Sequence, residues 1–492
     1  MNLPEDCIPS DPQDVTWDVV IVGTGAGGGP AGLNLARRGK SVLFLERGSL
    51  SDPQQLSPVA GKVDTGSFPY ADAPCFRMGS GIGGSTALFG MAMDRFRPVD
   101  FTPHRFAHLA PAATLPDMWP IQYEDLDPYY REAEVLFRLR GSVDPLTPVR
   151  GGLLDPQVPS EAEERMTGML TRAGLHPYSL HYAREQLPGC DACLGKPCAR
   201  PCRNDVGRMC VIPAIENGAR ILPGCVALKL ETRGRSIHQV HCRWNGRPVA
   251  IRGRHFILAL NALSTPTLLL RSANDTFPDG VGNSSGLVGR NLMAHVSDYL
   301  AVRFDGMGGQ INAQLHNGIS LNDFYFRDGM KLGNLHAHSM DVSYFLERME
   351  PRCRPDETLG TALFFTILED FPYAENRVTP QAGAEEECWW EYHYPDELRR
   401  RATMLLTSFA SAIPGCEVIA RKPSGILNAS HACGTCRFGD DPRSSVLDRN
   451  NKMHDLENVY VLDASFFPSS GGISPSLTIV ANSLRVSSQI AN

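Results

Sequence analysis

Long apolar runs and an excess of basic charge are both missing from this sequence. No stretch approaches the roughly 18 consecutive apolar residues that a membrane-spanning helix needs. The 47 Lys and Arg residues are outnumbered by 54 Asp and Glu residues, so the clustered basic charge of a nucleic-acid-binding surface is not expected. With 46 glycines and 37 prolines among 492 residues, the chain is also not of low complexity. These exclusions leave a globular protein whose chain is long enough to bury a sizeable core.

The start of the chain has no targeting signal. Its first fifteen residues contain four acidic and no basic side chains, and no apolar run follows them. A secretory signal peptide needs both a basic start and such a run. We therefore expect a cytoplasmic protein, although a mature form that had lost a leader would look the same. The 14 cysteines are too sparse for a disulfide scaffold.

A dinucleotide-binding pattern stands near the start of the chain. The apolar run 19–22 is followed by Gly23, Gly25 and Gly28, in G-x-G-x-x-G spacing, and a second apolar run ends in Glu46. In this pattern the first glycine permits a tight turn, the second lets a pyrophosphate approach the backbone, and the third lets the helix pack on the strand. The helix start then offers unpaired N–H groups to the phosphates, and the acid accepts hydrogen bonds from a ribose. The motif alone does not distinguish FAD from NAD.

Four further segments make that distinction. They are GSGIGGSTALFGMAMDRFRPVDF (79–101), WPIQYEDLDPYYREAE (119–134), VGNSSGLVGRNLMAH (281–295) and the stretch from HACGTCRFGDD to NSLRVSSQI (431–490). Together with the glycine motif, and in this order, they resemble the glucose–methanol–choline (GMC) family of FAD-dependent oxidoreductases.

The resemblance implies a fold of the α/β class, α+β overall. A Rossmann-like FAD-binding domain is expected to be interleaved with a substrate-binding domain, in which helices flank an antiparallel sheet. We expect the first domain to comprise residues 1–100, 200–295 and 425–492, and the second to comprise 101–199 and 296–424, with a cysteine-rich segment at 190–210. Apolar residues recur at helical spacing through 396–409, which predicts a helix packed behind the antiparallel sheet.

The resemblance also implies an activity, the oxidation of an alcohol or sugar hydroxyl by hydride transfer to flavin N5. His431, just before the G-T-C motif, matches the family's catalytic base, and an imidazole suits that task because its pKa lies near working pH. Ser474, 43 residues later, stands where family members usually carry His or Asn. A serine hydroxyl can still make one hydrogen bond to substrate, although its side chain is shorter than that of His or Asn. Ser474 followed by Pro475 is equally typical of a helix start.

Further residues match family positions that contact FAD. These predicted contacts are Gly23, Gly25, Gly28, Glu46, Gly83, Gly84, Ser85, Thr86, Val226, Asp463, Ala464, Pro475, Ser476, Leu477 and Thr478. The last four begin a helix whose N-terminal dipole would stabilise negative charge on reduced flavin. Leu88 and Phe89 stand where members with covalently attached FAD can carry a histidine, so we expect non-covalent FAD.

Four cysteines lie within 13 residues: Cys190, Cys193, Cys198 and Cys202. Such closely spaced thiolates are typical ligands of iron–sulfur clusters, either 3Fe–4S or 4Fe–4S. The segment is similar to one in the catalytic subunits of multi-subunit FAD sugar dehydrogenases, which carry a 3Fe–4S cluster. Disulfides, a zinc site and free thiols are the alternatives.

The electron acceptor depends on this segment. A cluster would pass electrons to a partner subunit or cytochrome, whereas without one oxygen or a soluble acceptor fits as well. Two other functions fit the same motifs. One is a redox-tailoring enzyme of secondary metabolism that acts on a bulky substrate, and the other is a non-redox lyase on the same fold.

Overall fold

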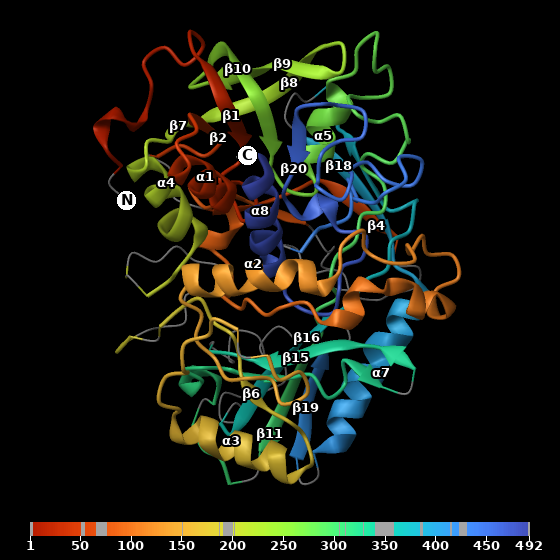
Figure 1. Ribbon diagram of the computed structural model, residues 1–492. Helices are drawn as coiled ribbons and strands as arrows, with labels where there is room; N and C mark the ends of the chain where they lie inside the picture. Colours follow the sequence, from red (N-terminus) through yellow and green to blue (C-terminus); the bar gives the residue numbers. More distant parts are fainter. Residues whose placement is uncertain are drawn as a thin grey trace.

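The protein is described by a computed structural model. It describes residues 3–50, 55–64, 76–149, 151–185, 187–189, 200, 202–304, 306–309, 311–327, 329–339, 359–383, 387–413, 416–422 and 431–490. Figure 1 shows one sheet with its helices in the upper half of the molecule and a second sheet with its helices in the lower half. Each sheet lies against an apolar core of its own.

The upper sheet has the order β7-β2-β1-β10-β9-β8, with β20 paired to β10. Its strands are β1 (Thr16–Val22), β2 (Val42–Glu46), β7 (Arg220–Pro223), β8 (Cys225–Arg233), β9 (Ser236–Trp244), β10 (Arg247–Leu258) and β20 (Val459–Val461). The pairs β1–β2, β2–β7, β1–β10 and β10–β20 are parallel, while β8, β9 and β10 pair antiparallel. Every residue of β2 is buried, as expected of a parallel strand covered on both faces.

Helices α1 (Gly28–Arg37), α4 (Ile212–Glu216) and α8 (Ser476–Ile490) lie beside this sheet (Figure 1). Helix α2 (Tyr123–Leu136) runs between the two halves of the molecule and contacts α8, where the Tyr130 hydroxyl and Thr478 Oγ1 are 2.8 Å apart. Helix α5 (Ser264–Arg271) follows β10 after a short turn.

The lower sheet is antiparallel and has the order β19-β11-β16-β15-β12-β6. Its strands are β6 (Tyr178–Ser179), β11 (Tyr299–Phe304), β12 (Ile319–Leu321), β15 (Gly333–Ala337), β16 (Thr361–Leu368) and β19 (Cys416–Lys422). The helix expected at 396–409 is present as α7 (Asp396–Ala412), and its Phe409 ring lies 4.8 Å from Phe364 of β16. Helix α3 (Glu161–Arg172) lies beside the same sheet. The predicted fold class is confirmed.

Smaller elements complete the described chain. The short strands are β3 (Gln55–Pro58) paired with β5 (Arg77–Ser80), β17 (Arg377–Pro380) and β4 (Gly61–Asp64) on either side of β18 (Cys388–His393), and β13 (Phe326–Arg327) paired with β14 (Met330–Lys331). The short helical turns are η1 (Glu5–Cys7), η2 (Gly84–Ala87), η3 (Pro98–Phe101), η4 (Pro103–Leu109), the π-helix η5 (Gly207–Val211), η6 (Asn312–Gln314) and η8 (Ala464–Phe466).

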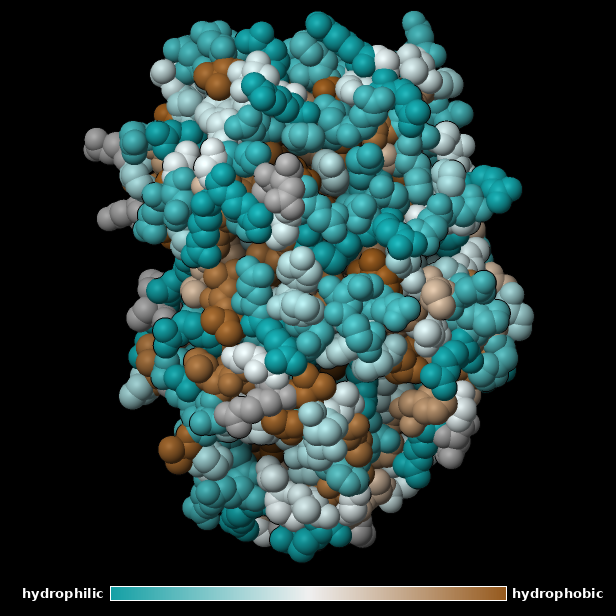
Figure 2. Space-filling model, in the orientation of Figure 1, coloured by the Kyte–Doolittle hydropathy of each residue, from teal (hydrophilic) through white to brown (hydrophobic). Residues whose placement is uncertain are grey.

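The two sheets take their strands from alternating stretches of the chain, and the exact division into two domains stays a prediction. Figure 2 shows that hydrophilic side chains cover most of one face of the molecule, with apolar side chains in small groups between them. Within the described ranges, no helix combines the length and apolar character needed to cross a membrane.

Candidate active site

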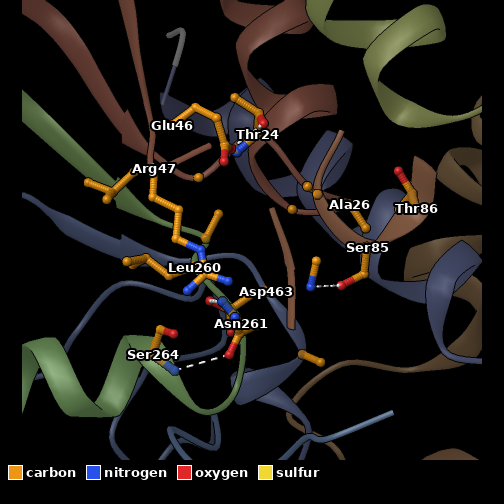
Figure 3. A pocket seen from close by; sticks show the side chains of 18 of the residues that line it. Thr24, Ala26, Glu46, Arg47, Ser85, Thr86, Leu260, Asn261, Ser264 and Asp463 are labelled. Carbon is orange, nitrogen blue, oxygen red and sulfur yellow. Dashed lines mark hydrogen bonds between the residues drawn. The ribbon is translucent and has the colours of Figure 1, made fainter. Parts of the chain in front are cut away.

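One cavity opens where β1, β2 and β10 end. It is lined by the turn between β1 and α1, the end of β2, part of η2, the start of β8, the turn between β10 and α5, and the start of α8 (Figure 3). His431 lines the same cavity. Ligands of open α/β sheets bind beyond the carboxyl ends of the strands, so this is where a dinucleotide is expected.

The glycines of the β1–α1 turn differ in what surrounds them. A Cβ at Gly28 would lie 1.9 Å from the Gly23 carbonyl oxygen, so this glycine is required for α1 to pack against the turn. A Cβ at Gly25 would meet nothing within 4 Å, although Gly25 lines the cavity and stands just before α1. A Cβ at Gly84 of η2 would lie 3.3 Å from the Gly25 Cα atom. Gly25 thus faces open space on the cavity wall, next to Gly84 and just before the start of α1, and this space fits a pyrophosphate.

The Glu46 carboxylate connects this turn to the neighbouring loop. Its Oε2 atom accepts hydrogen bonds from the Thr24 hydroxyl (2.6 Å) and the Thr24 N–H (3.3 Å), and Figure 3 shows the two side chains next to each other. Its Oε1 atom accepts from the N–H groups of Gly48 (2.9 Å) and Gly81 (3.1 Å). Four donors match the acceptor capacity of a carboxylate. Glu46 therefore has a structural role, which is to hold the loop before η2 against the β1–α1 turn, and its contact with a ribose stays a prediction.

A pair of histidines belongs to the same site, with His431 on the cavity wall. The Nδ1 atoms of His295 and His431 are 2.9 Å apart, and the two rings are nearly perpendicular. His295 is fully buried, while His431 is partly exposed, toward the cavity. Burial lowers the pKa of His295 to about 4, and burial together with His295 and His336 holds the pKa of His431 well below its ordinary value. Both rings are therefore neutral at pH 7.

Comparison with known proteins places the chain in a family. Sequence profiles described as GMC oxidoreductase match residues 62–297 and 400–483. The chain belongs to the GMC oxidoreductase family. Proteins of this family bind FAD, and the open space at Gly25 together with the start of α1 fits the pyrophosphate of that cofactor.

Two curated relatives align with almost the whole chain. Paromamine 6′-oxidase of Streptomyces fradiae is 31% identical over 97% of this chain and 92% of its own length. The 6‴-hydroxyparomomycin C oxidase of Streptomyces lividus is 30% identical with the same coverage. Among solved structures, pyridoxine 4-oxidase from Mesorbium loti has a TM-score of 0.69 at 18% identity, over 96% of this chain and 99% of that one. This GMC oxidoreductase is an enzyme that acts on CH–OH groups.

Most of the site residues that were predicted from the sequence line this cavity. Those that line it are Gly23, Gly25, Glu46, Gly84, Ser85, Thr86, Val226, His431, Asp463, Ala464, Pro475 and Ser476. Those that do not line it are Gly28, Gly83, Ser474, Leu477 and Thr478. Ser474 is buried, and the Thr478 hydroxyl bonds Tyr130 instead. The suggested substrate contact of Ser474 stays a prediction.

None of the described residues of the cysteine-rich segment lines the cavity. Cys190, Cys193 and Cys198 lie outside the described residues, and Cys202 is buried. In the part of the chain that the structure describes, no group of three or more His, Cys, Asp or Glu side chains could hold a metal. The iron–sulfur cluster and the electron-accepting subunit or cytochrome that depends on it stay predictions.

The resemblance also implies that the run 256–270, an apolar strand followed by a turn and a helix, approaches the FAD, but no residue of it was singled out. Several residues of the turn between β10 and α5 line the cavity. Asn261 has a φ of 120°, which few residues other than glycine adopt, and its Oδ1 atom accepts the N–H groups of Leu263 (2.8 Å) and Ser264 (3.0 Å). The Asp463 carboxylate accepts the Asn261 N–H at 3.0 Å and the Thr265 hydroxyl at 2.5 Å. Figure 3 shows Asn261, Ser264 and Asp463 close together at one side of the cavity. The available signal in the sequence was an asparagine, Asn261, between an apolar strand and a helix, where a turn of this kind is expected.

The two glycines of the turn give a matched pair of variants. We expect Gly25→Ala to leave the melting temperature of the cofactor-free protein unchanged but to weaken FAD binding at least about tenfold, because its methyl group enters the space for the pyrophosphate. Gly28→Ala should lower that melting temperature, because its methyl group meets backbone. Calorimetry and FAD titration measure the two effects. Unchanged FAD affinity in Gly25→Ala would contradict cofactor binding at this turn.

Proposed function

We propose that this GMC oxidoreductase oxidises an alcohol or sugar hydroxyl and that His431 takes the hydroxyl proton. The observation that carries the proposal is the position of His431 on the wall of the cavity that contains the β1–α1 turn and the start of α8. Because its pKa lies well below the ordinary value of 6.5, the imidazole is neutral at pH 7. A neutral imidazole can accept a proton from an alcohol, whereas a charged one cannot.

The reaction turns CH–OH into C=O, so a hydride leaves the carbon and a proton leaves the oxygen. FAD, when bound, supplies the acceptor for the hydride. The β1–α1 turn and the start of α1 would hold its pyrophosphate, and Val226 and Asp463 line the same cavity. Because Ser474 does not line the cavity, the proposal gives the substrate proton to His431 alone.

Anaerobic mixing of the purified, FAD-loaded protein with a panel of alcohols, sugars and paromamine tests the proposal. At least one hydroxyl compound should bleach the flavin absorbance and yield the matching carbonyl product. Turnover of a substrate while the flavin stays oxidised would sink the proposal and favour the lyase alternative. A flavin that no member of a broad panel reduces would count against hydroxyl oxidation.

A tailoring reaction on a bulky substrate is the second candidate, and the names of two relatives favour it. Paromamine 6′-oxidase and 6‴-hydroxyparomomycin C oxidase are both named for oxidations of such compounds, and each aligns with 97% of this chain. If this candidate is right, kcat/KM for paromamine should exceed that for simple alcohols by at least about a hundredfold, or roughly 3 kcal/mol of transition-state stabilisation. Equal values would favour a general alcohol dehydrogenase or oxidase.

A further inference from the structure

The position of the proton on His295 follows from its neighbours. Its Nε2 atom lies 2.9 Å from the Gly471 carbonyl oxygen and 3.1 Å from the Ser470 carbonyl oxygen. Carbonyl oxygens only accept hydrogen bonds, so Nε2 must carry a proton. A neutral imidazole has a single N–H proton, and His295 is neutral because it is fully buried. The Nδ1 atom of His295 is therefore a bare acceptor.

The proton on His431 follows in turn. Its Nδ1 atom lies 2.9 Å from the bare Nδ1 atom of His295, and two lone pairs at that distance would repel each other. His431 must therefore donate from Nδ1, and its own single proton is used there. Its Nε2 atom then keeps a free lone pair. In the opposite arrangement Nε2 of His431 would carry the proton and could not accept one.

We propose that His295 is a positioning residue that sets the tautomer of His431, so that Nε2 of His431 is the atom that takes the substrate's hydroxyl proton. This inference rests on the proposed function. His295 does not line the cavity and acts only through His431.

The backbone brings the two histidines together. Met293 and Cys433 face each other as an antiparallel bridge and exchange both backbone hydrogen bonds, at 3.0 and 2.9 Å. His295 follows Met293 by two residues, and His431 precedes Cys433 by two, so the two side chains lie on the same side of this pair. The contact between the rings is thus built into the pairing of the two segments.

The carbonyl groups that orient His295 are themselves held in place. The Gly471 N–H donates to Glu369 Oε1 (3.1 Å), and the Gly472 N–H donates to the Tyr325 hydroxyl oxygen (2.8 Å). The Tyr325 hydroxyl donates to Asp100 at 2.8 Å. Behind them the Lys331 Nζ atom lies 2.7 Å from Asp100 and 2.6 Å from Glu369, and all three side chains are fully buried. A rigid, charged cluster therefore aims two carbonyl oxygens at one nitrogen of His295.

Among the residues that the structure describes, few other titratable groups act on the pair. Asp100 and Lys331 act on His295 with opposite signs, and His336 of β15 acts on His431. Burial, aided by His338, lowers the pKa of His336 to about 3, so His336 stays neutral through the working pH range. Around neutral pH, the tautomer of His431 therefore depends on the hydrogen bonds of His295 rather than on a nearby titration.

Two substitutions of His295 separate orientation from packing. His295→Gln keeps an amide N–H₂ for the two carbonyl groups and an amide oxygen for the N–H of His431, whereas His295→Leu fills the space without either. We expect His295→Leu to lower the limiting rate of flavin reduction by about 10–100-fold while KM changes less than about twofold, and His295→Gln to recover most of the rate. Stopped-flow reduction of the FAD-loaded variants by a substrate from the panel gives both constants.

Several outcomes would overturn the inference. An unchanged rate in His295→Leu would do so, and so would an equal loss in both variants. Failure of the proposed function is recognised separately, because His431→Ala would then reduce its flavin at the normal rate. If His295→Leu does not fold, the ¹⁵N spectrum of the histidine-labelled wild-type protein decides. There the His431 resonances, identified by their loss in His431→Ala, must show a protonated Nδ1 and a bare Nε2, and the reverse would overturn the inference.

Discussion

Replacement of His431 by alanine is expected to slow flavin reduction by substrate by about 10²–10⁴-fold, the usual contribution of a general base. FAD should stay bound, because the β1–α1 turn and η2, which flank the space for its pyrophosphate, do not depend on the imidazole. Anaerobic stopped-flow absorbance measures the rate, and the flavin absorbance per protein measures FAD content. His104→Ala is the matched control, because His104 is a largely exposed histidine outside the cavity, and it should leave the rate unchanged.

The pH dependence of the wild-type reduction rate belongs to the same prediction. A histidine whose pKa is lowered stays neutral to lower pH than usual, and the base is lost only when the pH falls through that pKa. Because the pKa of His431 lies well below 6.5, the rate should be level between about pH 7 and 8 and should fall only below pH 6.5. A decline centred at or above pH 6.5, or a rapid rate in His431→Ala, would show that another group is the base.

The residues that sequence reasoning located are those whose roles are local. Gly23, Gly25 and Gly28 stand within six residues of one another, and each has a task that a strand, turn and helix impose on the backbone. Glu46 ends the next strand, so its arrival at the same cavity follows from a parallel pairing of β1 and β2. His431 was located by its place in a motif, and the structure puts it on the same cavity wall.

The residues that sequence reasoning missed depend on contacts between distant segments. His295 ends a segment that was recognised, yet its contact with His431 spans 136 positions and follows from the Met293–Cys433 bridge. Lys331, Asp100 and Glu369 come from three separate stretches of chain, and each alone looks like an ordinary surface charge. No periodicity or spacing in the sequence predicts that tertiary packing buries these three charged side chains together.

The second large effect that we expect is a loss of stability when this buried cluster is disrupted. We expect Lys331→Met to lower the free energy of unfolding by about 3–5 kcal/mol, because it leaves two carboxylates buried without their cation. Urea unfolding, followed by intrinsic fluorescence, measures the loss. The matched control is Arg377→Met, which breaks an ion pair of similar length, 2.8 Å to Glu391, between side chains 45% and 36% exposed. It should cost less than about 1 kcal/mol.

The loss of stability in Lys331→Met should also depend on pH, and the charges of the cluster determine whether it grows or shrinks as the pH rises. Burial raises the pKa of Glu369 above its ordinary value even with Lys331 in place, and removal of the lysine takes away the charge that lowers it. A carboxyl whose folded pKa is raised is stabilised when protonated, so its contribution to stability is lost as the pH rises through that pKa. Lys331→Met should therefore be more strongly destabilised at pH 8 than at pH 5, and Glu369→Gln added to it should recover part of the loss at pH 8. A loss that matches Arg377→Met at both pH values would mean that the buried lysine does not hold the carboxylates. The loop that carries the Ser470 and Gly471 carbonyl groups would then owe its position to packing alone.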